Sequence, residues 1–438
     1  MKGHKNISHR IAITGMGVIA PNGTNIDTFW ANCRAGKSGV ARISDFDTIK
    51  FTSQVAGIVP DFDPACYNIS ERQRSTLDRY ALFALAAAEQ AVSQAGLDTT
   101  AIDRDRLGVC IGTAIAGTKY MEQEFLRRTN GGKDAFDGGV LDRVLTANAG
   151  FHSASSEVAR KYDARGPVYT LATGCTAGLD ALGEALEMIR SGQVDVVIAG
   201  ATEAPITPIA VAAFDIIGAL ASDRNHEPER ASRPYDKGRA GFVLGEGCGI
   251  FVLERLDRTL ARGATILAEL SGMGSTCNAY HMTNLAPEGY DLHRAMKLAL
   301  ADAGMAPVEI EHVNAHGSST PQNDVNETNA VKKTFGAHAY KVVMCSVKSI
   351  VGHSLGAANV VEAVAAVLSI MHQEAPPTIN YVTPDPECDL DYTPKEARKL
   401  EINHVLKDAS GFSGVHSAIV LSKYPTTQLE DLMEDLSQ

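Results

Sequence analysis

Residues 11–17 read Ile-Ala-Ile-Thr-Gly-Met-Gly, and residues 267–274 read Leu-Ala-Glu-Leu-Ser-Gly-Met-Gly. Each stretch is an apolar run typical of a β-strand that closes on Gly-Met-Gly, a pattern that predicts a turn. An internal echo of this kind is the first sign of a duplicated architecture.

The elements predicted after each stretch follow in the same order. The first region gives helix 81–96, strand 107–112, strand 168–171, helix 179–190 and strand 248–253; the second gives helix 292–304, strand 310–315, strand 342–345, helix 357–372 and strand 418–421. Because a helix follows each inner strand, we expect parallel strand pairs with helices on both sheet faces. The order predicts an α/β fold of two duplicated βαβ-rich halves, residues 1–260 and 261–438, packed as layers around shared helices. The alternative is a chance likeness between two α/β segments.

Composition narrows the classes of protein that fit. Hydrophobic residues make up 45% of the 438 residues and charged residues 21%, as in a compact α/β protein. The formal net charge of −12 disfavours nucleic acid and an anionic membrane as partners. No apolar run approaches the roughly 18–20 residues of a membrane span, and no signal-peptide core follows residues 1–5. We therefore expect a cytoplasmic protein.

Eight cysteines are scattered along the chain without a Cys-x-x-Cys pair or the spacing of zinc ligands, so we expect reduced thiols and no metal site. Cys175 lies in Thr-Gly-Cys-Thr-Ala-Gly (residues 173–178), where a predicted strand gives way to a helix. The N-terminus of a helix favours thiolate over thiol, which predicts a lowered pKa and a nucleophile. The alternative for any one of these cysteines is a small buried hydrophobe.

Two histidines of the second half are candidates for the same site as Cys175. His316, in Asn-Ala-His-Gly-Ser-Ser-Thr-Pro (residues 314–321), follows an apolar run and so lies at a strand end, where ligands gather in such sheets. Ser318 and Thr320 beside it offer hydroxyls suited to an extended ligand. His353 occupies the place that Cys175 holds in the first half, five residues after Lys348. If a pseudo-twofold relates the halves, the two helix N-termini converge on one site.

The sequence also permits a serine hydrolase. Gly-His-Ser-Leu-Gly (residues 352–356) fits the nucleophile elbow, with Ser354 as nucleophile and His404 or His416 as base. The elbow normally follows its strand directly, whereas residues 346–351 intervene here. Separately, the glycines that flank Phe412 predict a mobile loop whose backbone N–H could point at an oxyanion.

Taken together, these motifs resemble the condensing enzymes of the thiolase superfamily, and more narrowly the β-ketoacyl-acyl carrier protein synthases (ketosynthases). The resemblance runs from Ile11 to about Lys423 and rests on a nucleophile cysteine followed by the two histidine motifs in order. Residues 173–180, 277–283, 386–392 and 410–412 look closer to the ketosynthase-alpha subunit of bacterial type II aromatic polyketide synthases. The family implies a thiolase-like fold with a layered αβαβα core.

The resemblance also implies the chemistry and its residues. Cys175 accepts an acyl group from the phosphopantetheine of an acyl carrier protein, at an oxyanion hole formed by the N–H groups of Cys175 and Phe412. His316 and His353 then assist decarboxylation of malonyl-carrier protein, and the carbanion attacks the acyl-enzyme. Lys348 and Glu362 match supporting polar residues, Ser318 and Thr320 would bind pantetheine, and no cofactor is needed.

Partners and alternatives follow from the same resemblance. An acyl carrier protein is expected, together with a catalytically silent chain-length factor as heterodimer partner; the chain itself keeps Cys175 and so is the active subunit. Arg72 and Arg74, near Arg79, are candidates for carrier docking, the alternative being a solvated helix face. A housekeeping fatty-acid 3-oxoacyl-acyl carrier protein synthase II is the second interpretation. Departures from the family pattern are Ser413, Val415, His416 and Asn359, which bear on loop mobility and substrate range.

Overall fold

A computed structural model describes residues 10–138 and 144–425. Its centre is a ten-stranded sheet with the strand order β10-β9-β13-β14-β8-β1-β7-β6-β4-β5. The N-terminal half contributes β1 (Ile11–Ile19), β4 (Leu107–Gly112), β5 (Val168–Leu171), β6 (Val196–Glu203) and β7 (Gly247–Arg255). The C-terminal half contributes β8 (Ala268–Cys277), β9 (His312–Asn314), β10 (Val343–Cys345), β13 (His404–Ser410) and β14 (Val415–Ser422).

The two halves have the same topology. Counted along the chain within each half, the strands lie in the spatial order 3-2-4-5-1 in both. The halves meet at β1 and β8, which pair antiparallel only over Ile11–Ile13 and Ala268–Leu270. The duplication expected from the sequence is therefore confirmed. The predicted division after residue 260 falls within α9 (Leu256–Ala261) and stays a prediction.

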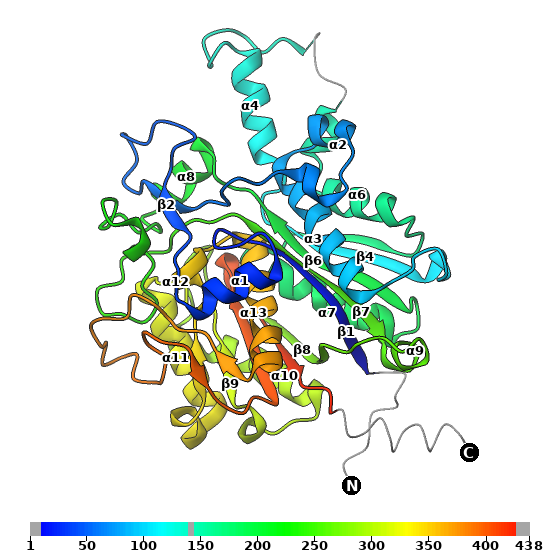
Figure 1. The fold of residues 1–438 in the computed structure, drawn as a ribbon. Coiled ribbons are helices and arrows are strands. Elements are labelled where there is room, and N and C mark those ends of the chain that lie inside the picture. The colour runs from blue at the N-terminus through cyan, green and yellow to red at the C-terminus, as the bar shows by residue number, and fades with distance from the viewer. Residues whose placement is uncertain (1–9, 139–143, 426–438) are drawn as a thin grey trace.

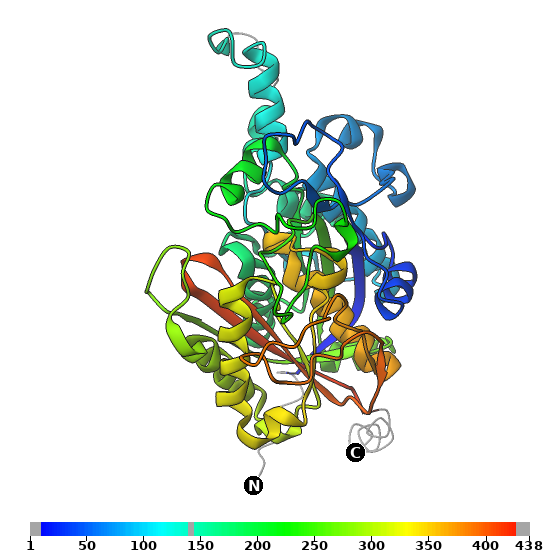
Figure 2. The same ribbon diagram turned by 90° about the vertical axis from the view of Figure 1, so that its left-hand side faces the viewer.

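Helices form the remaining layers (Figures 1 and 2). On the outer faces, α3 (Arg79–Ala95) packs on β1 and β7, and α10 (Tyr290–Ala303) packs on β8 and β14. Between the halves, α7 (Ala177–Arg190) and α13 (Ala358–His372) contact each other and strands of both halves. This is the layered thiolase-like arrangement that the sequence predicts.

The other elements are short or lie around this core. They are α1 (Ile26–Arg34), β2 (Val40–Arg42), β3 (Val55–Gly57), α2 (Glu71–Thr76), α4 (Thr118–Arg128), α5 (Leu145–Ala149), α6 (Ser153–Tyr162), α8 (Pro208–Asp215), α11 (Pro321–Phe335), α12 (Lys348–Val351), β11 (Glu374–Ala375) and β12 (Arg398–Lys399). Helix α4 projects away from the body of the molecule in both views (Figures 1 and 2).

The expected parallel strand pairs are present, and antiparallel pairs join them into a mixed sheet. Strands β4, β5 and β6 pair in parallel, but β7 is antiparallel to both β6 and β1. The equivalent strands of the second half repeat this pattern. The repeat recognised in the sequence did not include β6 and β13. Each of these strands pairs in parallel with one neighbour and antiparallel with the other.

The two Gly-Met-Gly stretches lie inside strands, so the predicted turns are wrong. Their glycines face the outer helices at very short range. A Cβ on Gly15 would lie 2.0 Å from the carbonyl oxygen of Ala91 in α3, and one on Gly274 would lie 2.3 Å from that of Ala295 in α10. The repeated glycines therefore allow each outer helix to approach its strand, an approach that a larger side chain would block.

One apolar segment is longer than the sequence analysis recognised. Residues 355–372, which contain α13, are apolar and long enough to cross a membrane, but 89% of the segment is buried inside the protein. Its hydrophobicity follows from its place between the two halves, because a helix surrounded by protein is apolar on all sides.

We expect Gly15→Ala and Gly272→Ala to destabilise the protein by similar amounts. Each Cβ would meet helix backbone at 2.0 to 2.5 Å, and overpacking of this kind typically costs about 1–3 kcal/mol. Gly138→Ala, whose Cβ would have nothing within 4 Å, serves as the control. Thermal unfolding of the three variants tests this: melting temperatures of Gly15→Ala and Gly272→Ala equal to that of the control would contradict it.

Candidate active site

Cys175 lies in a 3₁₀ turn, Gly174–Thr176, between β5 and α7. Gly174 has a φ of +67°, a left-handed conformation that glycine adopts at little cost. The side-chain amide of Asn359 in α13 donates to the Cys175 carbonyl oxygen at 2.6 Å. The cysteine therefore lies next to a helix start, as predicted, and its backbone is hydrogen-bonded to α13 of the other half.

His353 lies in the equivalent place before α13. It follows Gly352, whose φ is +74°, and precedes the 3₁₀ turn Leu355–Ala357 that leads into the helix. Its backbone N–H donates to Val243 at 2.7 Å, and its carbonyl oxygen accepts from Gly245 at 2.9 Å. These bonds fix the histidine to the segment that precedes β7.

The starts of α7 and α13 pack directly against each other. A Cβ on Gly178 would lie 2.3 Å from Val360 and 3.0 Å from the carbonyl oxygen of Gly356. The convergence of helix starts expected from a pseudo-twofold is therefore present.

His316 follows β9, as its sequence position predicts. The backbone N–H groups of His316 and Gly317 donate to the buried Glu327 carboxylate at 2.6 and 2.8 Å. The imidazoles of His316 and His353 lie with ring centroids 5.3 Å apart at 85°. Two imidazoles from different strand–helix units are thus held edge to face.

A fully buried ion cluster supports His316. The Lys348 ammonium lies 2.7 Å from Glu362, whose other oxygen lies 2.8 Å from Lys407. Lys348 Nζ also donates to the His316 carbonyl oxygen at 2.7 Å and lies 3.4 Å from its Nδ1. Donation to Nδ1 would leave the ring proton on Nε2. Lys407 was not recognised in the sequence, although a Lys-Asp pair within the apolar run 405–409 was an available signal.

Burial sets the charge state of the three central side chains. Burial first, and then the Lys348 charge, hold the pKa values of His316 and His353 well below the usual histidine range, so both rings are neutral at neutral pH. Burial raises the pKa of the Cys175 thiol to about 11, although Lys348 and the N–H groups of Phe412 and Cys175 act to lower it. The prediction of a lowered thiol pKa is therefore wrong for this structure, because desolvation outweighs the helix start and the nearby cation.

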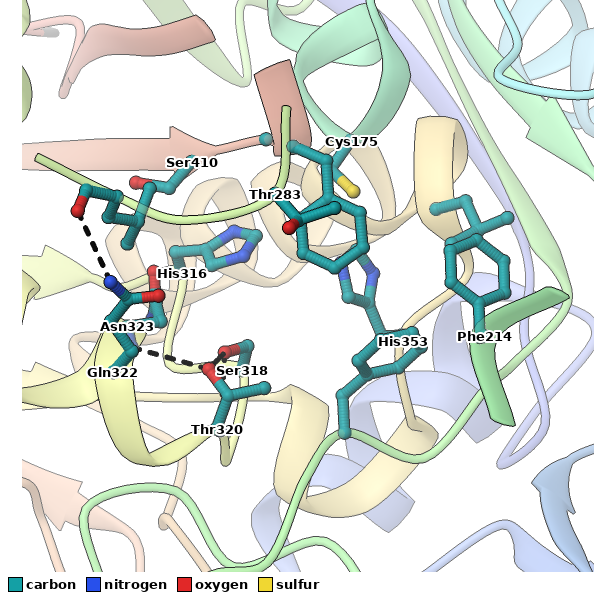
Figure 3. Close-up of a pocket in the computed structure, with 15 residues that line it drawn as sticks. Cys175, Phe214, Thr283, His316, Ser318, Thr320, Gln322, Asn323, His353 and Ser410 are labelled. Carbon is teal, nitrogen blue, oxygen red and sulfur yellow. Dashed lines mark hydrogen bonds between the residues drawn. The ribbon is translucent and has the colours of Figure 1, made fainter. Parts of the chain in front are cut away.

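These side chains line a cavity of about 480 Å³, part of it open to solvent (Figure 3). Ser318 and Thr320 also line it, with their hydroxyl oxygens 2.9 Å apart. The wall also includes three apolar side chains that were not assigned to the site from the sequence, Phe214, Phe242 and Leu355, together with the predicted Phe412. Phe214 comes from a segment with little periodicity, which gave no signal of its place.

Phe412 lies in the turn Phe412–Gly414 between β13 and β14. Ser413 adopts a φ of +67°, and its N–H donates to the Met282 carbonyl oxygen at 2.6 Å. A non-glycine residue in this region costs about 1–2 kcal/mol. The serine that departs from the family's usual glycine thus stands at the strained position of the loop.

The candidate docking arginines lie on α2. Arg72 is exposed and Arg74 is half-buried. Arg79, grouped with them in the sequence, instead pairs with Glu246 at 2.8 Å and donates to the Val59 carbonyl oxygen. Only the first two present cationic groups on the surface of this segment.

The geometry does not favour the serine hydrolase. Helix α12 separates β10 from Ser354, which is buried, while the pocket is lined by Cys175. His404 bonds Ser422, and His416 bonds Ser410. Among residues 10–138 and 144–425, no group of three or more His, Cys, Asp or Glu side chains is arranged to hold a metal ion.

Comparison with known proteins places this geometry in a family. Residues 8–259 match the family described as beta-ketoacyl synthase, N-terminal domain, and residues 267–382 match beta-ketoacyl synthase, C-terminal domain. The tetracenomycin polyketide synthase ketoacyl synthase alpha subunit of Streptomyces glaucescens is 44% identical over 97% of this chain and 99% of its own length. The 3-oxoacyl-[acyl-carrier-protein] synthase 2 of Coxiella burnetii is 43% identical over 94% of this chain and 98% of its own.

Solved structures agree with the sequence matches. A type II polyketide synthase ketosynthase, in complex with its acyl-carrier protein and bound to the hexaketide, superposes with a TM-score of 0.89 at 44% identity over 95% of this chain and 99% of that one. The ishigamide ketosynthase/chain length factor superposes with a TM-score of 0.85 at 34% identity, over 95% of this chain and 99% of that one. The chain belongs to the beta-ketoacyl synthase family, whose members are acyltransferases of thiolase-like fold.

Proposed function

We propose that this protein elongates a polyketide chain by decarboxylative Claisen condensation of an acyl group on Cys175 with malonyl-acyl carrier protein. The observation that supports this most is the placement of one thiol and two neutral imidazoles in a single pocket at the converging starts of α7 and α13. Each neutral imidazole has one N–H that it can donate to a developing negative charge, which the condensation requires.

In the first half-reaction, the Cys175 sulfur attacks the thioester carbonyl of the acyl-carrier. The thiol proton passes to a neutral imidazole in the pocket and then to the departing carrier thiolate, so the products are acyl-Cys175 and carrier thiol. The N–H groups of Cys175 and Phe412 stabilise the tetrahedral oxyanion, and one such donor is typically worth about 10²–10³ in rate.

In the second half-reaction, malonyl-carrier loses CO₂, and the bonding electron pair becomes an enolate. His316 and His353 donate to the thioester oxygen as this charge develops. The enolate carbon attacks acyl-Cys175, the cysteine leaves as thiolate and takes up a proton, and the 3-oxoacyl-carrier is released. Lys348 and Glu362 orient His316, while Ser318 and Thr320 would bind the pantetheine arm.

The substrate class and partners rest on the relatives. One solved neighbour is a ketosynthase in complex with its acyl-carrier protein, and another is a ketosynthase/chain length factor. We assign an acyl carrier protein and a chain-length factor to this chain on that basis, with the cytoplasm as location and no cofactor. The fatty-acid 3-oxoacyl-acyl carrier protein synthase is the second candidate, because the relative of that name is nearly as similar as the polyketide one.

Substitutions should separate the two half-reactions. Cys175→Ala should abolish acyl-enzyme formation and elongation but leave malonyl decarboxylation, since both imidazole donors remain. His316→Ala or His353→Ala should permit some acylation of Cys175 while lowering decarboxylation by about 10²–10³. Mass spectrometry of the acyl-enzyme and CO₂ release measure the two steps.

Ser354→Ala is the matched control for that experiment. It should change both steps far less than the Cys175 and histidine variants, because Ser354 is buried and does not line the pocket. An inactive Ser354→Ala beside a fully active Cys175→Ala would overturn the ketosynthase assignment.

Charge reversal on α2 tests carrier docking. Arg72→Glu with Arg74→Glu should raise the KM for carrier-bound substrate and leave kcat little changed, because the carrier is acidic and the change is remote from Cys175. Lys341→Glu, an exposed position before β10 and hence at the opposite strand end from the pocket, is the control. Equal KM values at low salt for the double variant and wild type would exclude this surface.

Co-expression distinguishes the polyketide interpretation from the fatty-acid one. With a chain-length factor subunit, the protein should elute as a heterodimer and release products of defined length from malonyl units, observed by size exclusion and product mass spectrometry. Length-controlled elongation by the isolated homodimer would instead establish the fatty-acid interpretation.

A further inference from the structure

Glu203 is a buried carboxylate that the mechanism above does not use. It is the last residue of β6, at the carboxyl end of the strand, and has no exposed surface. Its two oxygens accept four hydrogen bonds. The donors are Ala114 N–H at 2.5 Å, Thr113 hydroxyl at 3.0 Å, Ile115 N–H at 3.2 Å and Gly356 N–H at 3.3 Å.

These donors belong to two separate turns, and both turns contain strain. The first runs from β4 toward α4 and includes Ala116 at a φ of +47°. The second joins His353 to α13 and includes Leu355 at a φ of +44°. Non-glycine residues persist in this region only where surrounding contacts over-determine them, and Glu203 accepts from residues adjacent to each.

Each turn lies next to one reactive side chain. The first extends β4, whose Gly112 would place a Cβ 2.4 Å from the Ala177 carbonyl oxygen at the start of α7, two residues after Cys175. The second turn follows His353 directly, and His353 lies three residues before the donor Gly356. A single carboxylate therefore joins the turn beside the cysteine to the turn that holds the histidine.

We infer that Glu203 is a positioning residue that sets Cys175 and His353 at the separation needed for the enolate to reach the acyl-enzyme. The inference rests on the proposed condensation. Its consequence is specific: without Glu203, each residue can still perform its own half-reaction, but the enolate formed at the histidines is protonated before it meets acyl-Cys175.

Only the ionised carboxylate can accept all four bonds without adding a donor of its own. Burial raises the pKa of Glu203 to about 7, while the four donors act to lower it. Besides burial, its charge raises the pKa values of the Cys175 thiol and the Tyr80 hydroxyl. A glutamine in its place would point its NH₂ group either at the N–H groups of Ala114 and Gly356 or at the Thr113 hydroxyl and the Ile115 N–H. In either orientation at least one backbone donor loses its acceptor, so Glu203→Gln weakens the connection while keeping the size of the side chain.

The test is the number of CO₂ molecules released per carbon–carbon bond formed by the purified protein with acyl- and malonyl-carrier. Wild type should release one. Glu203→Gln, and Glu203→Asp as a shorter side chain that keeps its charge, should lose condensation by about 10- to 100-fold, the scale of a misplacement near 1 Å, with decarboxylation much less affected. The ratio should therefore rise by about 10-fold or more. A general loss of folded protein would lower both rates together and leave the ratio at one.

Glu254→Gln is the matched control. Glu254 is also a buried carboxylate on this sheet, but it pairs with Val196 at the other end of β6 and bonds Arg262. Its substitution should lower the melting temperature and leave the ratio unchanged. A ratio of one in both Glu203 variants, with active wild type, overturns the inference.

A second measurement does not depend on the proposed reaction. Amide hydrogen exchange should accelerate in residues 113–116 and 353–357 of Glu203→Gln and not of Glu254→Gln. If wild type fails to elongate but exchange accelerates in both turns, the proposed function is wrong and the structural role of Glu203 stands. Unchanged exchange in either turn overturns that role.

Discussion

Two helices from different halves of this protein begin side by side, and the absence of a side chain at Gly178 permits it. A Cβ there would collide with Val360, and α7 and α13 could not both start at the centre of the molecule. Cys175 and His353 occupy the turns before these two starts, so one packing constraint decides whether the nucleophile and the imidazole share a pocket. The outer helices obey the same constraint through the glycines of β1 and β8, which let each half close around its own strands.

Once the helices are packed, burial governs the chemistry. A histidine removed from water resists protonation, and a cysteine removed from water resists deprotonation. Lys348 adds to the first effect and opposes the second, and its pairing with Glu362 stabilises a cation near both rings in the interior. The result is a pocket prepared to donate hydrogen bonds to substrate oxygens.

The sequence predicted those parts of this arrangement that depend on local patterns of residues. Apolar runs and terminal glycines located α3, α10 and most strands, and the order of elements revealed the duplication and hence the meeting of Cys175 with His353. Contacts between distant segments carried no such signal. The glycines of β1 looked like a turn because the helix that approaches them is some 70 residues away in sequence. Phe214 lines the pocket, and Glu203 bonds the turns beside it, through tertiary packing alone.

The thiol pKa shows most clearly why local rules fail at such a site. A helix start next to a cysteine favours thiolate, and the sequence contained that feature. The same convergence of helices that creates the site also shields the partly exposed Cys175 from much of the solvent, and this raises the pKa of its thiol to about 11. In the free protein the thiol is therefore protonated at neutral pH, and its proton has to move as the thioester is attacked. Reactivity then depends on substrate being in place, with its oxygen at the N–H groups of Cys175 and Phe412, rather than on a thiolate waiting in the empty pocket.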